Sequence, residues 1–182
     1  MQNKTIVSMT LTALFSALVF IGTTIKIPLP TGAFVHLGNA MFLLAVLLIG
    51  YSKGAIAGSI GFALFDLLNG YATEAPYFIL ECFIVGAFSY GAIKLCRTNE
   101  LKLPQIIFIG AMTGIAKLVM TQLKNWLFLL LSGAGTKQAF LAASVKLPAT
   151  LINVCTTILI VSLLYFPIRK LLLKQGLTSI HH

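Results

Sequence analysis

The sequence predicts an all-α integral membrane protein with six transmembrane helices and with both termini in the cytoplasm. Of its 182 residues, 58% are hydrophobic and only 9% are charged, whereas a soluble domain carries about 25% charged residues. The mean hydropathy is +0.98. The long apolar runs lack the alternation of a membrane β-barrel, so helices are the expected spanning elements. The length fits one compact domain over residues 1–182.

Turn residues divide the chain into six apolar stretches. A short turn around Ser52 and Lys53 separates the second stretch from the third, while Pro76 and Pro104 stand at first-turn positions of the fourth and fifth. Pro148 lies inside the sixth stretch, where it predicts a kink. The expected spans are residues 5–25, 34–49, 54–69, 76–95, 105–131 and 138–166.

The basic residues set the orientation. The net charge is +9, from 13 basic and 4 acidic residues. If the N-terminus is cytoplasmic, eight Lys and Arg residues fall on the inner side and only Lys26 and Lys137 on the outer side, as the positive-inside rule requires. The positive charge is therefore explained by the lipid bilayer, and no nucleic-acid partner is expected.

The third span combines packing residues at one end with polar residues at the other. Gly54, Gly58 and Gly61 form a stripe of small residues, which lets membrane helices approach to backbone contact. Asp66 and Asn69 share a face near the other end. A carboxylate inside a membrane helix costs roughly 2.5–3.5 kcal/mol on insertion scales and usually has a function or a partner.

Most other polar residues of the spans fall in the outer half of the membrane in this topology. A polar pocket open to the outside explains that placement most simply. The candidate substrate-binding residues are His36, Asn39, Asp66, Asn69, Tyr71, Tyr77, Glu81, Lys124, Asn125, Lys146 and Asn153.

Each of these residues also has a structural interpretation. Asp66 and Glu81 could bind polar groups of a substrate, or they could only neutralise Lys117, Lys124 or Lys146 in ion pairs. The tyrosines could stack on a flat ligand ring, or they could belong to the aromatic belt at the membrane interface. The sequence leaves these alternatives open.

Motifs of several enzyme classes are missing from the sequence. It contains no nucleophile elbow, no His-Glu-x-x-His and no phosphate-binding loop of the Gly-x-x-x-x-Gly-Lys type. Cys82, Cys96 and Cys155 do not have metal-ligand spacing. We therefore expect no catalysis, no ATP hydrolysis by this chain, no cofactor and no metal.

Three motifs resemble those of a known family. They are Ala13-Leu-Phe-Ser-Ala17 in the first span, His36-Leu-Gly-Asn-Ala40 in the second and Phe65-Asp-Leu-Leu-Asn-Gly-Tyr71 in the third. Together with the six-span layout they resemble the substrate-binding S component of energy-coupling factor (ECF) vitamin transporters. Within that family the chain looks most similar to members assigned to hydroxymethylpyrimidine or pyridoxine-like compounds.

The resemblance implies a transport mechanism in a bacterial cell membrane. An S component binds its vitamin with high affinity from outside, docks on a membrane-embedded coupling subunit (EcfT type) joined to two cytoplasmic ATPase subunits, and topples so that the pocket opens inward. Ala13 and Ala17 would contact the coupling subunit. The loop after the first span would act as the gate, and its gating residues here would be Lys26, Pro28, Pro30 and Gly32.

Two other functions compete with this one. An ion-gradient-driven secondary transporter could use Asp66 or Glu81 as proton carrier, and a membrane scaffold would need no pocket at all. A secondary transporter usually shows inverted repeats and paired broken helices. The sequence shows neither, which favours the S component.

Overall fold

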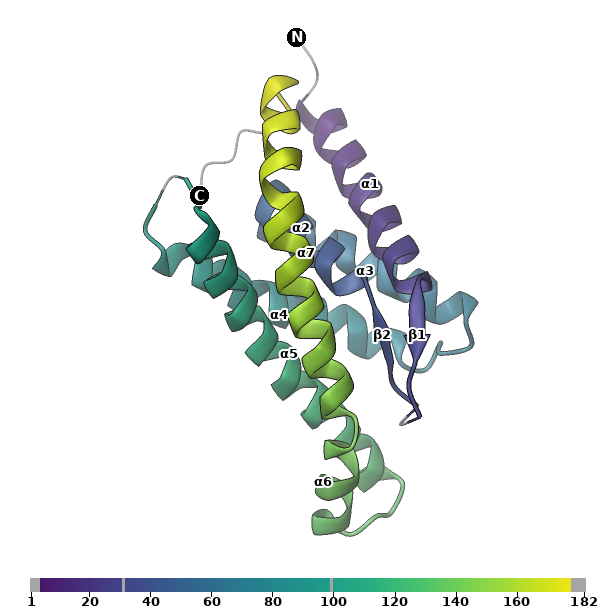
Figure 1. Ribbon diagram of the computed structural model, residues 1–182. Coiled ribbons are helices and arrows are strands. Elements are labelled where there is room, and N and C mark those ends of the chain that lie inside the picture. The colour runs from purple at the N-terminus through teal and green to yellow at the C-terminus, as the bar shows by residue number, and fades with distance from the viewer. Residues whose placement is uncertain (1–3, 31, 99, 178–182) are drawn as a thin grey trace.

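The computed structural model describes residues 4–30, 32–98 and 100–177. Within them the chain is mostly helical, with seven α-helices and one antiparallel β-hairpin (Figure 1). The elements are α1 (Lys4–Thr24), β1 (Lys26–Pro28), β2 (Phe34–His36), α2 (Gly38–Ile49), α3 (Tyr51–Leu68), α4 (Ala75–Leu95), α5 (Leu103–Leu131), α6 (Thr136–Ser144) and α7 (Leu147–Lys174). The start of α1 and the end of α7 lie at one end of the molecule, and the hairpin and α6 lie toward the other, which we call the hairpin end (Figure 1).

In the part of the chain that the structure describes, four helical segments are long and apolar enough to cross a membrane. They are α1, α4, α5 and the combined stretch of α6 and α7. α2 is apolar but has only 12 residues, so it rises about 18 Å against a hydrocarbon core of about 30 Å. α3 contains glycines, a serine and an aspartate among its 18 residues. The chain is thus a multi-pass membrane protein, while the count of six spanning helices stays a prediction.

Two expected spans differ from the helices that form. Residues 34–36 of the second span are a strand, because they pair with β1 in the register Lys26↔His36 and Pro28↔Phe34. The sixth span is divided into α6 and α7 near Val145 and Lys146. Pro148 sits in the first turn of α7, where its missing amide hydrogen costs nothing, so it starts a helix and does not kink one.

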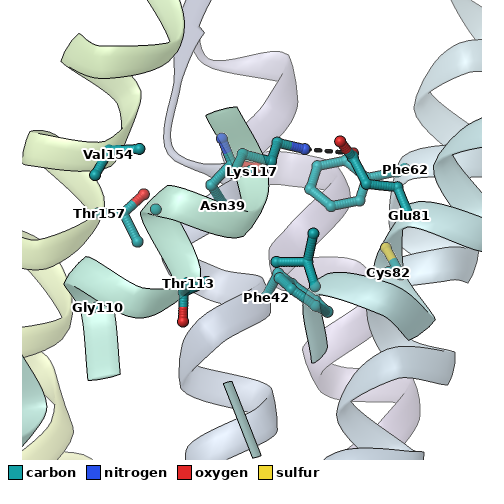
Figure 2. A pocket seen from close by; sticks show the side chains of 12 residues that line it. Asn39, Phe42, Phe62, Glu81, Cys82, Gly110, Thr113, Lys117, Val154 and Thr157 are labelled. Carbon is teal, nitrogen blue, oxygen red and sulfur yellow. Dashed lines mark hydrogen bonds and ion pairs between the residues drawn. The ribbon is translucent and has the colours of Figure 1, made fainter. Parts of the chain in front are cut away.

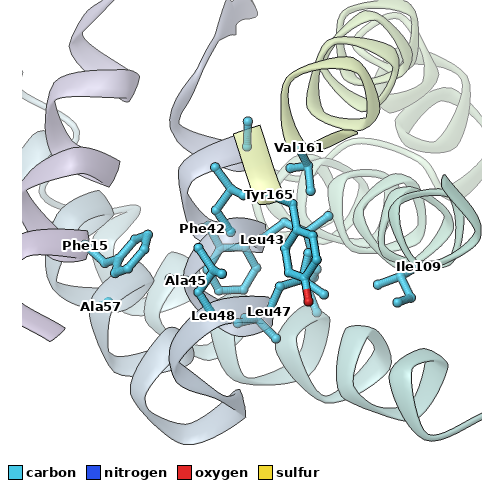
Figure 3. Close-up of a cluster of buried hydrophobic side chains, with 14 of the residues drawn as sticks. Phe15, Phe42, Leu43, Ala45, Leu47, Leu48, Ala57, Ile109, Val161 and Tyr165 are labelled. Atoms are coloured by element: carbon cyan, nitrogen blue, oxygen red, sulfur yellow. The ribbon is translucent and has the colours of Figure 1, made fainter. Parts of the chain in front are cut away.

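α2 forms the centre of the core. It packs against α1, α3, α4 and α7, and Leu43, Leu47 and Leu48 are fully buried. Figure 3 shows these side chains beside Val161 and Tyr165 of α7. A helix that is apolar on every side is stable only when it is surrounded, which explains why the shortest apolar helix lies in the middle.

The glycines of α3 allow this close packing. A Cβ at Gly54 would lie 2.6 Å from the Val46 backbone, and one at Gly61 would lie 2.6 Å from the carbonyl oxygen of Ser16. Neither distance leaves room for a methyl group. The packing role predicted for this stripe is confirmed, and it holds α3 against both α1 and α2.

Candidate functional site

A cavity of about 160 Å³ opens at the hairpin end between the hairpin, α3, α4, α5 and α7. Thr23 of α1 and Asn39 of α2 also line it, so side chains from widely separated segments converge on one cavity, as the sequence predicts for a polar pocket. Ten of the eleven candidate substrate-binding residues line this cavity: His36, Asn39, Asp66, Tyr71, Tyr77, Glu81, Lys124, Asn125, Lys146 and Asn153.

Asn69 is the candidate that does not line the cavity. It is the exposed C-cap of α3, and its amide donates to the carbonyl oxygen of Phe65 at 2.9 Å. Its Oδ1 lies 3.5 Å from the ammonium of Lys26. Asp66 and Asn69 do not share a helix face as predicted, because α3 ends at Leu68. Asn69 instead contacts Lys26 of the hairpin, outside the cavity.

Aromatic rings form one wall of the cavity. Phe62, Phe65 and Tyr71 line it together with Phe34 and Phe78. The Phe65 and Tyr71 rings are stacked, with centroids 6.2 Å apart and an interplanar angle of 14°. Such a wall suits a flat heterocycle.

The sequence analysis missed most of this wall. Phe62, Phe65 and Asp66 are spaced as i, i+3 and i+4, so the helical pattern could have placed the two rings beside the carboxylate. Phe34 and His36 were read as the start of a helix. Only the two-residue period of a strand puts both of them on the cavity side.

Two ion pairs cross the cavity. Lys117 pairs with Glu81, whose side chain is 2% exposed, and Lys124 pairs with Glu74. The Tyr77 hydroxyl lies 3.1 Å from Oε1 of Glu81, so that carboxylate is bound on both oxygens. Buried charges need partners of this kind, because an isolated ion is too costly in low dielectric.

Among the residues that the structure describes, Asp66 and Lys146 have no ion-pair partner. Asp66 is 4% exposed, and its Oδ2 is a buried atom without a hydrogen-bond partner. No ion pair of Lys146 occurs in the described part of the chain. Leaving a buried acceptor unsatisfied costs about 1–3 kcal/mol. A ligand that donates a hydrogen bond to Asp66 would remove that cost.

A smaller cavity adjoins the main one. It measures about 20 Å³ and shares Asn39, Glu81 and Lys117 with the larger cavity. Figure 2 shows the Lys117–Glu81 pair above it and the side chains of Asn39 and Thr157 beside it. This volume holds about one water molecule. Because Glu81 and Lys117 line both cavities, their ion pair lies between the two, and we call it the floor of the larger cavity.

The β-hairpin covers the cavity and is attached on two sides. On the α7 side, the Asn153 side chain accepts from the amide of His36 at 2.9 Å and donates to the carbonyl of Phe34 at 3.0 Å. The two bonds extend the sheet pattern of β2 and engage both the oxygen and the nitrogen of the Asn153 side-chain amide. Asn153 therefore holds the hairpin in this structure.

On the α3 side, Lys26 holds the hairpin through aromatic rings. Its ammonium lies 4.7 Å from the Phe65 centroid, 5.2 Å from Phe34 and 5.7 Å from Tyr71. A cation over ring faces gains roughly 0.5–1 kcal/mol at an exposed site. The other expected gating residues lie along the same segment: Pro28 ends β1, Pro30 is in the turn and Gly32 adopts φ +74° and lines the cavity.

His36 lies in β2 and is neutral. Burial, together with the nearby charges of Lys117 and Lys26, lowers the pKa of His36 to about 3. Its Nδ1 accepts the amide hydrogen of Gly38 at 3.2 Å. The ring proton is therefore on Nε2, which leaves that nitrogen as a hydrogen-bond donor.

The two alanines expected to dock a partner lie on the outer face of α1. Ala13 and Ala17 are both exposed, whereas Leu11, Phe15 and Val19 on the opposite face are buried in the core. The outer face therefore has a flat strip that the fold itself does not use.

The architecture indicates a multi-pass membrane protein, and the structure places a cavity at its hairpin end. A family model for the S component of ECF-type riboflavin transporters matches residues 3–170. The chain therefore belongs to this S component family. Comparison with curated proteins and with solved structures gave no match. S components are substrate-binding subunits of transporters and not enzymes, and they work with a coupling subunit and ATPase subunits.

Proposed function

We propose that this chain binds a small heterocyclic vitamin or precursor with high affinity on the extracellular side of the cell membrane. It would then deliver the compound inward by toppling on the coupling subunit. The observation that carries the proposal is the cavity at the hairpin end, where predicted polar residues from separate segments meet an aromatic wall. In this proposal six helices span the membrane of a bacterium, and both termini are cytoplasmic.

Riboflavin is the first substrate to test, because the matching family is named for it. Its ring system would stack on the aromatic wall, and its hydroxyl groups could donate to Asp66. A hydroxymethylpyrimidine or pyridoxine-like compound is the second candidate. The cavity volume of about 160 Å³ favours a smaller ring, and such compounds carry hydroxymethyl donors for the same carboxylate.

A binding experiment separates the two candidates. The purified chain would be titrated with riboflavin, followed by quenching of flavin fluorescence, and with pyridoxine and hydroxymethylpyrimidine, followed by calorimetry. Saturable binding of one compound with a stoichiometry near one is expected. If none of the three binds, the proposed substrate class is wrong.

Transport by the assembled complex tests the mechanism. Ala13→Trp or Ala17→Trp should abolish assembly with the coupling subunit and uptake, because close helix contact in lipid needs a flat strip. Ligand binding by the isolated chain should stay intact. Uptake that needs no ATPase subunits and collapses with the ion gradient would instead support a secondary transporter, and normal assembly of both variants would argue against docking at α1.

A further inference from the structure

The charged side chains that line the main cavity balance one another. Three are acidic and three are basic, and two of each are already joined in the pairs Lys117–Glu81 and Lys124–Glu74. Asp66 on α3 and Lys146 at the start of α7 remain. The six charged residues that line the cavity are Asp66, Glu74, Glu81, Lys117, Lys124 and Lys146.

Two further groups lie near the cavity. His36 is neutral, for the reasons given above. Lys26 is not among the lining residues, and its ammonium lies at the rim against ring faces and Asn69, where it is half-buried. When Asp66 is ionised, the six charges that line the cavity therefore cancel, and Lys26 is an additional cation at the rim.

Without Asp66, the start of α7 would be a favourable place for an anion. Lys146 is the N-cap residue of this helix, and its side chain lines the cavity. The positive end of the helix dipole adds to the lysine charge there. The carboxylate of Asp66 lines the same cavity and opposes both contributions, so it repels an anion while its unpartnered Oδ2 accepts from a neutral donor.

We propose that Asp66 makes this site selective for the uncharged form of its substrate and against the phosphate ester of the same compound. This inference rests on the proposed function and adds a specificity-determining residue to it. A phosphate group brings about two negative charges and no donor for the carboxylate. Like charges brought together in a closed site cost several kcal/mol.

Matched compound pairs test the inference: riboflavin with riboflavin phosphate, and pyridoxine with pyridoxine phosphate. In the unmodified chain the uncharged member should bind at least about a hundredfold more tightly, the size expected for a like charge in a closed site. Asp66→Asn keeps the shape and removes the charge. It should weaken binding of the uncharged member by about tenfold, because one charge-assisted hydrogen bond is lost.

The decisive quantity is the Kd of the phosphorylated member in Asp66→Asn, which should fall by about tenfold or more once the repulsion is removed. Glu100→Gln is the matched control, because it removes a carboxylate that is 79% exposed in the loop between α4 and α5. It should change neither Kd. Asp66→Ser removes the same charge and repeats the measurement if Asp66→Asn does not fold.

The outcomes separate this inference from the proposed function. Selectivity against the phosphate that persists unchanged in both Asp66 variants would mean exclusion by size and would overturn the inference. Equal binding of both members by the unmodified chain would also overturn it, while leaving the vitamin substrate in place. If neither member of either pair binds and hydroxymethylpyrimidine fails as well, the proposed substrate class falls and this inference falls with it.

Discussion

The core around α2 is tightly packed, whereas the hairpin end of the molecule contains a cavity. The same helices, α5 and α7, contribute to both regions. In the centre, Leu43 and Leu47 meet Val161 without exposed surface. At the hairpin end, α5 and α7 instead carry Lys117, Lys146 and their polar neighbours around a cavity. The packed core and the cavity involve different stretches of α5 and α7, so mutations in each region should have separable effects.

The largest effect on stability should come from the packed centre. Leu47→Ala leaves a void beside α7 and should lower the free energy of unfolding by about 2–5 kcal/mol. The Kd of the folded fraction should change by less than about twofold, because Leu47 does not line the cavity. Thermal unfolding in detergent and a binding titration measure the two quantities. A large change in Kd would show that the packing of the core and binding at the cavity are not independent.

The Lys117–Glu81 pair at the floor of the cavity should have the next largest effect on stability. Glu81→Gln leaves Lys117 without its carboxylate and should destabilise the protein by about 1–3 kcal/mol, the cost of an unsatisfied buried polar group. The double variant Glu81→Gln with Lys117→Met removes both charges and should recover much of that loss. Thermal unfolding of the single and double variants tests this. If the double variant is no more stable than the single one, the loss of stability in Glu81→Gln does not come from the unpaired charge of Lys117.

The two attachments of the hairpin should differ in size. Asn153→Leu loses both bonds to β2 and should speed ligand release about tenfold or more, at about 1 kcal/mol for each hydrogen bond. Lys26→Met keeps the apolar stem but loses the cation over the rings, which should speed release only about twofold to fivefold. Stopped-flow measurement of bound ligand chased with excess competitor gives both rates. Equal rates, or a larger effect of Lys26→Met, would contradict this order.

The same comparison explains how far the sequence could predict the molecule. Hydrophobic runs and proline positions indicate the long helices α1, α4 and α5, because length in lipid is set by apolar residues. They cannot show that Pro148 begins α7, since a proline in a first turn and a proline at a kink look alike until the preceding residues are placed.

The sequence indicates cavity residues most clearly where a residue type is costly in lipid, while their role in substrate binding stays a prediction. Asp66, Glu81 and Lys146 are conspicuous because charges rarely enter membrane helices, and all three line the cavity. Phenylalanines carry no such signal, so Phe62 and Phe65 were overlooked. The involvement of Asn153 with the hairpin could not be inferred, because it depends on a contact with the backbone of β2, more than a hundred residues away in sequence.

A bulky side chain placed in the cavity would show whether the substrate binds there. Thr121 lines the cavity from α5, whereas Val119, two residues earlier, is 60% exposed on the outer surface of the same helix. Thr121→Trp should abolish binding of the vitamin that the unmodified chain binds, while Val119→Trp, an equal increase in volume, should leave its Kd unchanged. Both should keep the thermal unfolding temperature within a few degrees. Normal binding by a folded Thr121→Trp variant would show that the substrate binds elsewhere and would contradict the account.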